Sequence, residues 1–545
     1  MRRINAFLMV WVLGITLITL PTDAWGIGRF PIYIDRDLLQ HDPQLLKHQT
    51  TLTNLYQQRD NQPLWLTDQG IKGGKVNSLL SSILRDVTLD PRGAIHRKAR
   101  IIKQDLSRHH DARGLVELEL QLTTLYINFL QHTIFGEIDW KAFDNYLEEQ
   151  EKKGVHGVWV RYPYKFDLLR LLSKENIPQT LKEITPKGYH YQALINKLYG
   201  LYKIKWRGGW GELPYFKTLK KGQSSKIVPL LRQRLTLSGD YRGKATQSQY
   251  FDTALEKAVK RFQLRHQVLA DGIVGSGTRR LLNISVTQKI HQLLLNIDRI
   301  KWIPRNDKDP RYLVVNIPEY MLHLYEYGRE TKRHRVIVGD PKHPSPIFSD
   351  TLSYITLNPY WKIPDSIIRK EVIPSVLKDP NYLKKHHLEI HKTWEENSSI
   401  ISPKSINWAQ YLQEGSKFPY RIMQPPGKDN ALGRIKFKFP NKFSVYLHDT
   451  PTRYLFKKNK RAFSHGCIRL DKPFSLLGSL AKNEPQIRAS EVKRILKSRQ
   501  KQELDLVHDI PINLVYLTTW VDKDNRLIFG DDIYQYDQHQ KRFIR

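Results

Sequence analysis

The chain of 545 residues contains a single cysteine, Cys467, and this limits how the protein can be held together. A lone thiol has no intramolecular disulfide partner, so packing, an intermolecular bond or chemistry remain for it. Its surroundings are the segment Ser464-His465-Gly466-Cys467-Ile468-Arg469-Leu470. Gly466 permits a tight turn, and positive charge from His465 and Arg469 favours a thiolate. The segment predicts a reactive cysteine, and an inert buried cysteine is the alternative.

A second polar cluster precedes this segment. Phe443, Val445 and Leu447 alternate with other residues, which predicts a strand that ends at His448 and breaks into a turn at Pro451. A histidine at a strand end and a cysteine at the next turn are well placed to be neighbours, as a Cys–His nucleophile pair requires. We expect Cys467 to be the nucleophile and His448 to take its proton, leaving a thiolate–imidazolium pair.

The pattern of His448 followed by Ser464-His465-Gly466-Cys467-Ile468-Arg469 resembles the active-site signature of the L,D-transpeptidases, the cysteine enzymes that cross-link bacterial peptidoglycan. The resemblance implies that the backbone carbonyl of Asp449 orients the histidine. It also implies that backbone N–H groups around His465, Gly466 and Cys467 receive the oxyanion. Four further residues are candidates for shaping the cleft and holding substrate carboxylates: Ser464, Arg469, Tyr446 and Trp361. Tyr446 and Trp361 could equally be packing residues.

The resemblance also implies a reaction. The donor is a peptidoglycan stem tetrapeptide, cleaved after its third residue, diaminopimelate, with loss of the terminal D-alanine. The acceptor is the side-chain amine of a neighbouring diaminopimelate, which gives a 3–3 cross-link. Water, a lipoprotein amine or a free D-amino acid are alternative acceptors that the sequence leaves open. The resemblance further implies inhibition by carbapenems, and no cofactor.

From Tyr312 onward the apolar pattern switches to a period of two, which predicts successive strands. This fits an all-β L,D-transpeptidase catalytic domain over 312–503. Its polar, partly helical stretch at 367–423 resembles the lid insertion of the longer enzymes. In that stretch His387 and His391 lack the glutamate that a helical zinc-protease site needs, so we expect no metal. Residues 504–545 predict a last strand and a charged tail.

The preceding chain predicts helices, so the expected fold class is multidomain α+β. Residues 25–221 form a helical scaffold that resembles the N-terminal region of the longer branch of the same family. Residues 222–283 predict three short helices, and the segment Asp271-Gly272-Ile273-Val274-Gly275 resembles the peptidoglycan-binding domain type 1. This module either binds peptidoglycan or is structural. An amphipathic stretch from Val286 to Trp302 predicts a linking helix within 284–311.

Residues 1–24 combine a charged start, an apolar run and a small-residue cleavage site, which predicts an export signal and a periplasmic protein. An uncleaved membrane anchor is the alternative. The net charge of +34 is spread along the whole chain, which favours the anionic polymers of a cell envelope over nucleic acid as partner. A non-catalytic envelope protein is the competing hypothesis, but it would not need the cysteine and histidine motifs.

Overall fold

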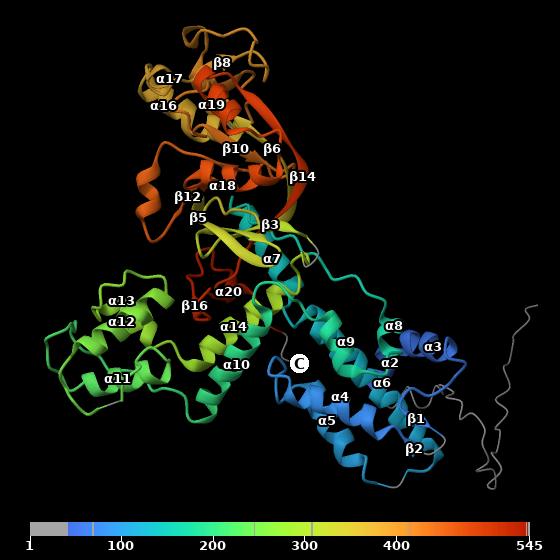
Figure 1. Cartoon of the computed structure of the whole chain (residues 1–545). Helices are drawn as coiled ribbons and strands as arrows, with labels where there is room; N and C mark the ends of the chain where they lie inside the picture. Colours follow the sequence, from blue (N-terminus) through green and yellow to red (C-terminus); the bar gives the residue numbers. More distant parts are fainter. Residues whose placement is uncertain are drawn as a thin grey trace, which may run out of the picture. The chain divides into compact units, whose positions relative to one another are not determined.

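The computed structural model describes residues 42–67, 70–108, 110–244, 246–306, 309–413, 415–540 and 542 (Figure 1). The expected signal segment, 1–24, lies outside the described residues. Two compact units are present: residues up to 82 with 98–127 and 168–177, and residues 83–97, 128–167 and 178–545. Helices combine with a large sheet, which confirms the predicted multidomain α+β class. In the part described, no helix has both the length and the apolar character to cross a membrane.

The first unit is organised around one buried carboxylate. It contains α3 (Gln49–Gln57), the short strands β1 (Leu66–Thr67) and β2 (Gly70–Ile71), and the first part of α6 (Ala112–Phe135). Glu119 on α6 accepts hydrogen bonds from the Tyr56 hydroxyl at 2.7 Å and from the backbone N–H groups of Leu64 at 2.5 Å and Trp65 at 3.0 Å. Burial raises the pKa of Glu119, while these donors satisfy its oxygens. The carboxylate thus fixes a loop onto the helix.

The second unit contains a nine-stranded sheet, in the order β12-β5-β13-β11-β10-β6-β14-β3-β4. Strand β5 also pairs with β4, so the sheet closes on itself. A closed sheet leaves few unpaired edges and encloses a continuous core. The strands are β3 (Arg311–Asn316), β4 (Met321–Glu326), β5 (Arg329–Gly339), β6 (Phe348–Leu357), β10 (Ile435–Lys438), β11 (Leu447–His448), β12 (Ala462–Ser464), β13 (Ile468–Leu470) and β14 (Gln502–Val515).

Strand β14 differs from the expected domain boundary at 503/504. It begins at Gln502 and lies between β6 and β3, so it belongs to the interior of the nine-stranded sheet and is not an appended strand. The polar tail after it is also fixed in place. Asp537 pairs with Arg299 at 2.7 Å, and Arg542 pairs with Asp298 at 3.0 Å. Sequence patterns could not show this, because the partners lie more than 200 positions apart.

Helix α14 (Val286–Ile300) occupies the position of the expected linking helix. It starts with a capping box in which Ser285 and Gln288 satisfy each other's backbone N–H groups. Its apolar stripe packs against α10 (Tyr191–Trp206), and the two lie side by side in Figure 1. Its other faces are buried as well, since Asp298 and Arg299 are paired with the C-terminal tail. The helix is therefore a core element, where the sequence predicted a linker.

The predicted three-helix module consists of α11 (Val228–Leu237), α12 (Thr253–Arg265) and α13 (Ser276–Leu282). It has a hydrophobic core of its own, which includes Leu231, Phe251, Phe262 and Leu282. Within the second unit, Arg265 of α12 donates to the carbonyl oxygen of Leu527 at 3.0 Å. Leu527 belongs to the hairpin of β15 (Thr519–Val521) and β16 (Leu527–Phe529), so the module is docked on this hairpin.

The stretch expected to resemble a lid forms a small α+β element with its own core. Strand β9 (Arg421–Gln424) lies between β7 (Trp361–Lys362) and β8 (Glu389–His391). The helical part comprises α15 (Asp365–Ile367), a π-helical turn (Ile368–Val372), α16 (Ile373–Lys378) and α17 (Tyr382–Lys385). Buried apolar residues such as Ile373, Ile390 and Ile422 join these pieces, so the stretch is more ordered than its polar composition predicted.

Candidate active site

Strand register places four of the predicted residues on one face of the sheet. Strands β11 and β13 run parallel, with Leu447 beside Ile468 and His448 beside Arg469. Leu447 and Ile468 point into the core and are fully buried. Because side chains alternate along a strand, Tyr446 and His448 point to the opposite face, as do Cys467 and Arg469. All four line one cavity of about 990 Å³.

A tight loop carries the cysteine between β12 and β13. Gly466 has a φ of 102°, a backbone conformation that favours glycine. The Ser464 hydroxyl donates to the carbonyl oxygen of Cys467 at 2.5 Å, so this predicted cleft residue closes the loop on itself. The hydroxyl of Ser345 donates to the carbonyl oxygen of Gly466 at 2.7 Å, and the backbone N–H of Ser345 donates to the Tyr534 hydroxyl at 3.1 Å. Ser345 and Tyr534 thus support the loop, and no sequence motif pointed to either.

Hydrogen bonding fixes the orientation of His448. Its Nδ1 lies 2.6 Å from the carbonyl oxygen of Asp449, and because a carbonyl only accepts, Nδ1 carries the proton. The other ring nitrogen, Nε2, is then left with a lone pair for a proton. The Asp449 carboxylate is itself held by the backbone N–H of Arg434 at 3.0 Å and by the Arg453 guanidinium at 2.7 Å. The carbonyl oxygen of Asp449 thus contacts the ring of His448.

The environments of the thiol and the imidazole both favour their neutral forms. The half-buried Cys467 thiol donates to the carbonyl oxygen of Ser444 at 3.8 Å, and not to His448. Burial raises the pKa of the Cys467 thiol. Burial, with a further contribution from the Arg469 charge, lowers the pKa of His448 to about 3. These two shifts oppose the expected thiolate–imidazolium pair, because a desolvated imidazolium beside Arg469 is unfavourable.

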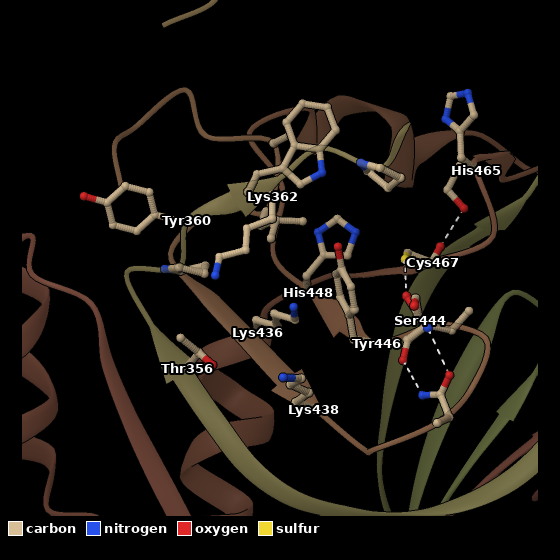
Figure 2. A pocket seen from close by; sticks show the side chains of 18 of the residues that line it. Thr356, Tyr360, Lys362, Lys436, Lys438, Ser444, Tyr446, His448, His465 and Cys467 are labelled. Carbon is tan, nitrogen blue, oxygen red and sulfur yellow. Dashed lines mark hydrogen bonds between the residues drawn. The ribbon is translucent and has the colours of Figure 1, made fainter. Parts of the chain in front are cut away.

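The side chain of His465 serves a different purpose from the one predicted. Figure 2 shows its ring turned away from the sulfur of Cys467. Its Nε2 lies 2.7 Å from Oε1 of Glu371, which lies in the π-helical turn of the insertion. The ring also lies 4.7 Å from that of His343. His465 therefore connects the cysteine loop to the insertion and does not place its charge beside the thiol.

The backbone of the cysteine loop is available to a ligand. Among the described residues, no hydrogen bond uses the N–H groups of His465, Gly466 and Cys467. Backbone N–H groups that converge at a turn can stabilise an oxyanion, and removing one such donor typically costs about 3 kcal/mol in other enzymes. The loop is thus equipped for the oxyanion role that the resemblance implies.

Several lysine side chains line the same cavity, and no sequence motif pointed to them. Strand β10 places Lys436 opposite His448, and Lys438 and the exposed Lys362 also line the cavity (Figure 2). The Lys436 ammonium lies 3.6 Å from the centre of the Tyr446 ring. Burial, and then the charge of Lys438, lowers the pKa of Lys436 to about 8. The alternation Ile435-Lys436-Phe437-Lys438 was the signal that could have placed both lysines on the site face.

The remaining predicted residues lie at the margin of the cavity. Arg469 donates from Nη1 to the Thr452 hydroxyl at 3.3 Å. Trp361 is half-buried on β7 and packs against the insertion's core, so it contributes to packing as well as to the cavity wall. The two histidines considered for zinc are not on one helix, since His391 lies on β8 and His387 precedes it. In the described part of the chain, no three potential metal ligands gather.

Comparison with known families gives three matches. Residues 310–485 match the family described as the L,D-transpeptidase catalytic domain. Residues 50–198 match a scaffold domain, and residues 224–282 match a "Putative peptidoglycan binding domain". These matches cover the cavity with Cys467 and the three-helix module.

A curated relative from Haemophilus influenzae, named "Putative L,D-transpeptidase", is 35% identical over 254 residues, which are 47% of this chain. The chain spans about half the length of that relative, 49%. Two solved structures are also similar. An L,D-transpeptidase from Mycobacterium smegmatis is 12% identical, covers 38% of this chain and 58% of its own, and has a TM-score of 0.18. An L,D-transpeptidase from Stackebrandtia nassauensis is 14% identical, covers 55% of this chain and 94% of its own, and has a TM-score of 0.19.

Proposed function

We propose that this chain, which belongs to the L,D-transpeptidase family, forms 3–3 cross-links in peptidoglycan through a thioester on Cys467. One observation carries the proposal: the thiol and the oriented imidazole of His448 line the same cation-rich cavity, beside a loop with free backbone N–H groups. A thiol suits acyl transfer because it is strongly nucleophilic and its thioester is readily attacked by amines.

In the first step, Cys467 Sγ attacks the carbonyl carbon of the diaminopimelate residue of a donor tetrapeptide. The thiol proton passes to Nε2 of His448, whose Nδ1–H stays bonded to the Asp449 carbonyl oxygen. The oxyanion is received by the backbone N–H groups of the cysteine loop. Collapse of the intermediate breaks the amide bond, and His448 returns the proton to the leaving amine of D-alanine. A thioester and neutral His448 remain.

In the second step, the side-chain amine of an acceptor diaminopimelate attacks the thioester. His448 takes a proton from that amine, and the sulfur leaves as the resting thiol once the proton is returned to it. A neutral imidazole is required at the start of both steps, which agrees with the lowered pKa of His448.

The lysines of the cavity support a substrate with several carboxylates. Lys436, Lys438 and Arg469 line it without a carboxylate bonded to them in the described structure. A stem peptide that contains diaminopimelate offers free carboxylates to such groups. We expect Lys436→Met to raise the KM for tetrapeptide roughly tenfold, since a charge-assisted hydrogen bond of this kind contributes about 1.5–3 kcal/mol. Lys428→Met, at an exposed position outside the cavity, is the matched control.

The test of the proposed reaction uses purified sacculi and the full chain, with muropeptides analysed by mass spectrometry. We expect dimers joined through two diaminopimelate residues, and none with Cys467→Ser. Tripeptides without such dimers would show that water is the acceptor and would exclude cross-linking. A carbapenem should add its intact mass to the peptide that contains Cys467, because the same nucleophile opens strained β-lactam amides. An adduct on another residue would contradict the mechanism.

A further inference from the structure

A second cavity, separate from the cysteine site, lies where the three-helix module meets the rest of the second unit. Its volume is about 490 Å³, and residues of α10, α11, α12, α14 and the β15–β16 hairpin line it. Seven of the lining residues are lysine or arginine, and Asp240 is the one acidic side chain among the described residues that line it. The cavity is therefore strongly cationic.

The carboxylate of Asp240 is already committed. Arg265 donates to both of its oxygens, from Nε at 2.7 Å and from Nη2 at 2.5 Å. Another lining cation, Arg526, pairs with Asp522 and Asp524 outside the cavity wall, each at 2.7 Å. The other five cations, among them Arg234 and Lys289, form no ion pair within the described structure. The cavity thus has more positive charge than the protein itself neutralises.

Two of these cations are buried, so leaving their positive charges without an anionic partner is energetically unfavourable. Arg234 is 3% exposed; its Nε donates to the Leu282 carbonyl oxygen at 3.0 Å, and its guanidinium lies over Trp210. Its Nη1 is buried and has no hydrogen-bond partner among the described residues. Buried polar atoms are normally bonded, and a buried unpaired charge is strongly unfavourable. The pKa of Arg234 is lowered to about 9, chiefly by this burial.

Lys289 presents the same situation from the opposite wall. It is 3% exposed, its ammonium donates to Nε2 of His266 at 3.0 Å, and it lies 3.8 Å from the centre of the Phe529 ring. His266 donates from Nδ1 to the Phe262 carbonyl oxygen, so Nε2 is a neutral acceptor and supplies no negative charge. Burial, and then the charges of Arg265 and Arg234, lowers the pKa of Lys289 well below its usual value.

We propose that this cavity is a second binding site, for a carboxylate group of the peptidoglycan stem peptide. An oxyanion there would lie beside the Arg234 guanidinium and the Lys289 ammonium, and would offset both buried charges. The aromatic rings of Trp210 and Phe529 provide apolar walls for the rest of a peptide. The choice of a stem peptide as the source of the carboxylate rests on the proposed function. The three-helix module and the elements packed against it would then bind the polymer jointly, at a site separate from Cys467.

The test is a chemical footprint that reads this cavity alone. Full-length Cys467→Ser protein, which cannot turn over substrate, is treated with phenylglyoxal, and the modification of Arg261 and Arg242 is measured by peptide mass spectrometry. The added probes are a stem tripeptide that ends in diaminopimelate and, separately, inorganic phosphate. We expect the tripeptide to protect both arginines at lower concentration than phosphate does. Protection by phosphate alone would overturn the assignment to a stem-peptide carboxylate, and protection by neither would overturn the site.

Variants at the rim complete the test, because Arg234 and Lys289 are too buried to be replaced safely. Lys197→Glu with Arg242→Glu reverses two lining charges of the cavity, and Arg261 then reports on binding. We expect protection of Arg261 to require at least roughly tenfold more tripeptide, because two attractive charges that line the cavity become repulsive. The control is Lys217→Glu with Lys226→Glu, which makes the same charge change outside the cavity, at exposed positions just before the module and within it. Equal protection in the two double variants would contradict the proposal. Protection of Arg261 by tripeptide in the Cys467→Ser protein, weakened by the two cavity substitutions, supports the site whether or not Cys467 proves to be the nucleophile.

Discussion

At the cysteine site, burial shifts the pKa values of individual side chains more than charged neighbours do. His448 is 5% exposed, and its single strong hydrogen bond leads to a backbone carbonyl, which orients the ring without stabilising an imidazolium as a carboxylate would. Cys467 bonds to another carbonyl, that of Ser444. Burial thus favours a protonated sulfur, whereas an adjacent positive charge would favour the thiolate.

This resting state predicts an unusual pH profile. With a pKa of about 3, His448 stays neutral and able to accept a proton until the pH falls close to that value. We therefore expect kcat/KM for tetrapeptide to stay level from neutral pH down to about pH 4–5, where an ordinary histidine of pKa about 6.5 would already be protonated. A steady-state rate series across this range measures it. An acid limb centred near pH 6.5 would contradict a neutral, buried His448.

The raised pKa of the thiol gives a second expectation at this scale. Iodoacetamide reacts with the thiolate, so alkylation of Cys467 should be slow at neutral pH and should accelerate as the pH rises above the usual thiol range. Peptide mapping of the alkylated residue at several pH values measures this. Fast alkylation at pH 7 would show that the ion pair predominates after all.

Loops and strands hold these side chains through contacts that cross the sheet. Ser345 receives the backbone N–H of Gly339 at 2.9 Å and donates to the carbonyl oxygen of Gly466 at 2.7 Å. We expect Ser345→Ala to lower the free energy of unfolding by about 1–3 kcal/mol, since it leaves two buried backbone groups unsatisfied. It should also reduce kcat, because the cysteine loop loses its support. Denaturant unfolding and steady-state rates measure the two effects.

Ser353→Ala is the matched control, since within the described residues that hydroxyl bonds to the Thr351 carbonyl oxygen alone, on a half-buried part of β6. We expect little change in either measurement. If the two alanine variants behave alike, Ser345 does not support the loop.

The insertion contacts the cysteine loop through Glu371 and His465. Both side chains are substantially exposed, so the pair should contribute less than about 1 kcal/mol to stability. We expect Glu371→Gln to leave the melting temperature unchanged while altering the rate of acylation by a carbapenem, because the insertion is then less restrained beside the cavity. Stopped-flow or timed intact-mass measurements give this rate. Glu395→Gln, exposed on the same insertion, should change neither quantity.

Local sequence patterns predicted many of these strands, but they did not predict all of the contacts that hold the site. Period-two alternation predicted β3, β4 and β6, and a strand ending at His448, because one face of each strand packs into the core. The same alternation occurs at Lys436 and Lys438, but these two lysines were not predicted to line the site. The pairing of Ser345 with Gly466 and of Tyr534 with Gly339 follows from the way the sheet closes, which no local pattern encodes. The direction of the His465 ring was likewise unpredictable, since Glu371 comes from a separate insertion.

At the scale of the whole molecule, segments far apart in sequence complete one another. Helix α14 is enclosed by α10, the β15–β16 hairpin and the C-terminal tail, so an expected connector became part of the core. The three-helix module is joined to the same hairpin by Arg265 and by the stacked rings of His266 and Phe529. A module attached only by flexible connections would have no such contacts. The way in which it is docked bears on what its removal should do.

We expect deletion of residues 222–283, bridged by a glycine-serine linker, to lower the melting temperature as well as retention on sacculi. Removing the module takes away Arg265 and His266, which exposes Leu527 and Phe529, both less than 10% exposed in the intact chain. Newly exposed apolar surface costs about 25 cal/mol per Å², so the loss should be measurable by calorimetry. Leu269→Ala, which truncates an exposed side chain on the module, is a control that should leave the melting temperature unchanged. An unchanged melting temperature after deletion, with retention lost, would show that the module serves binding alone and that its contact with the hairpin does not stabilise the unit.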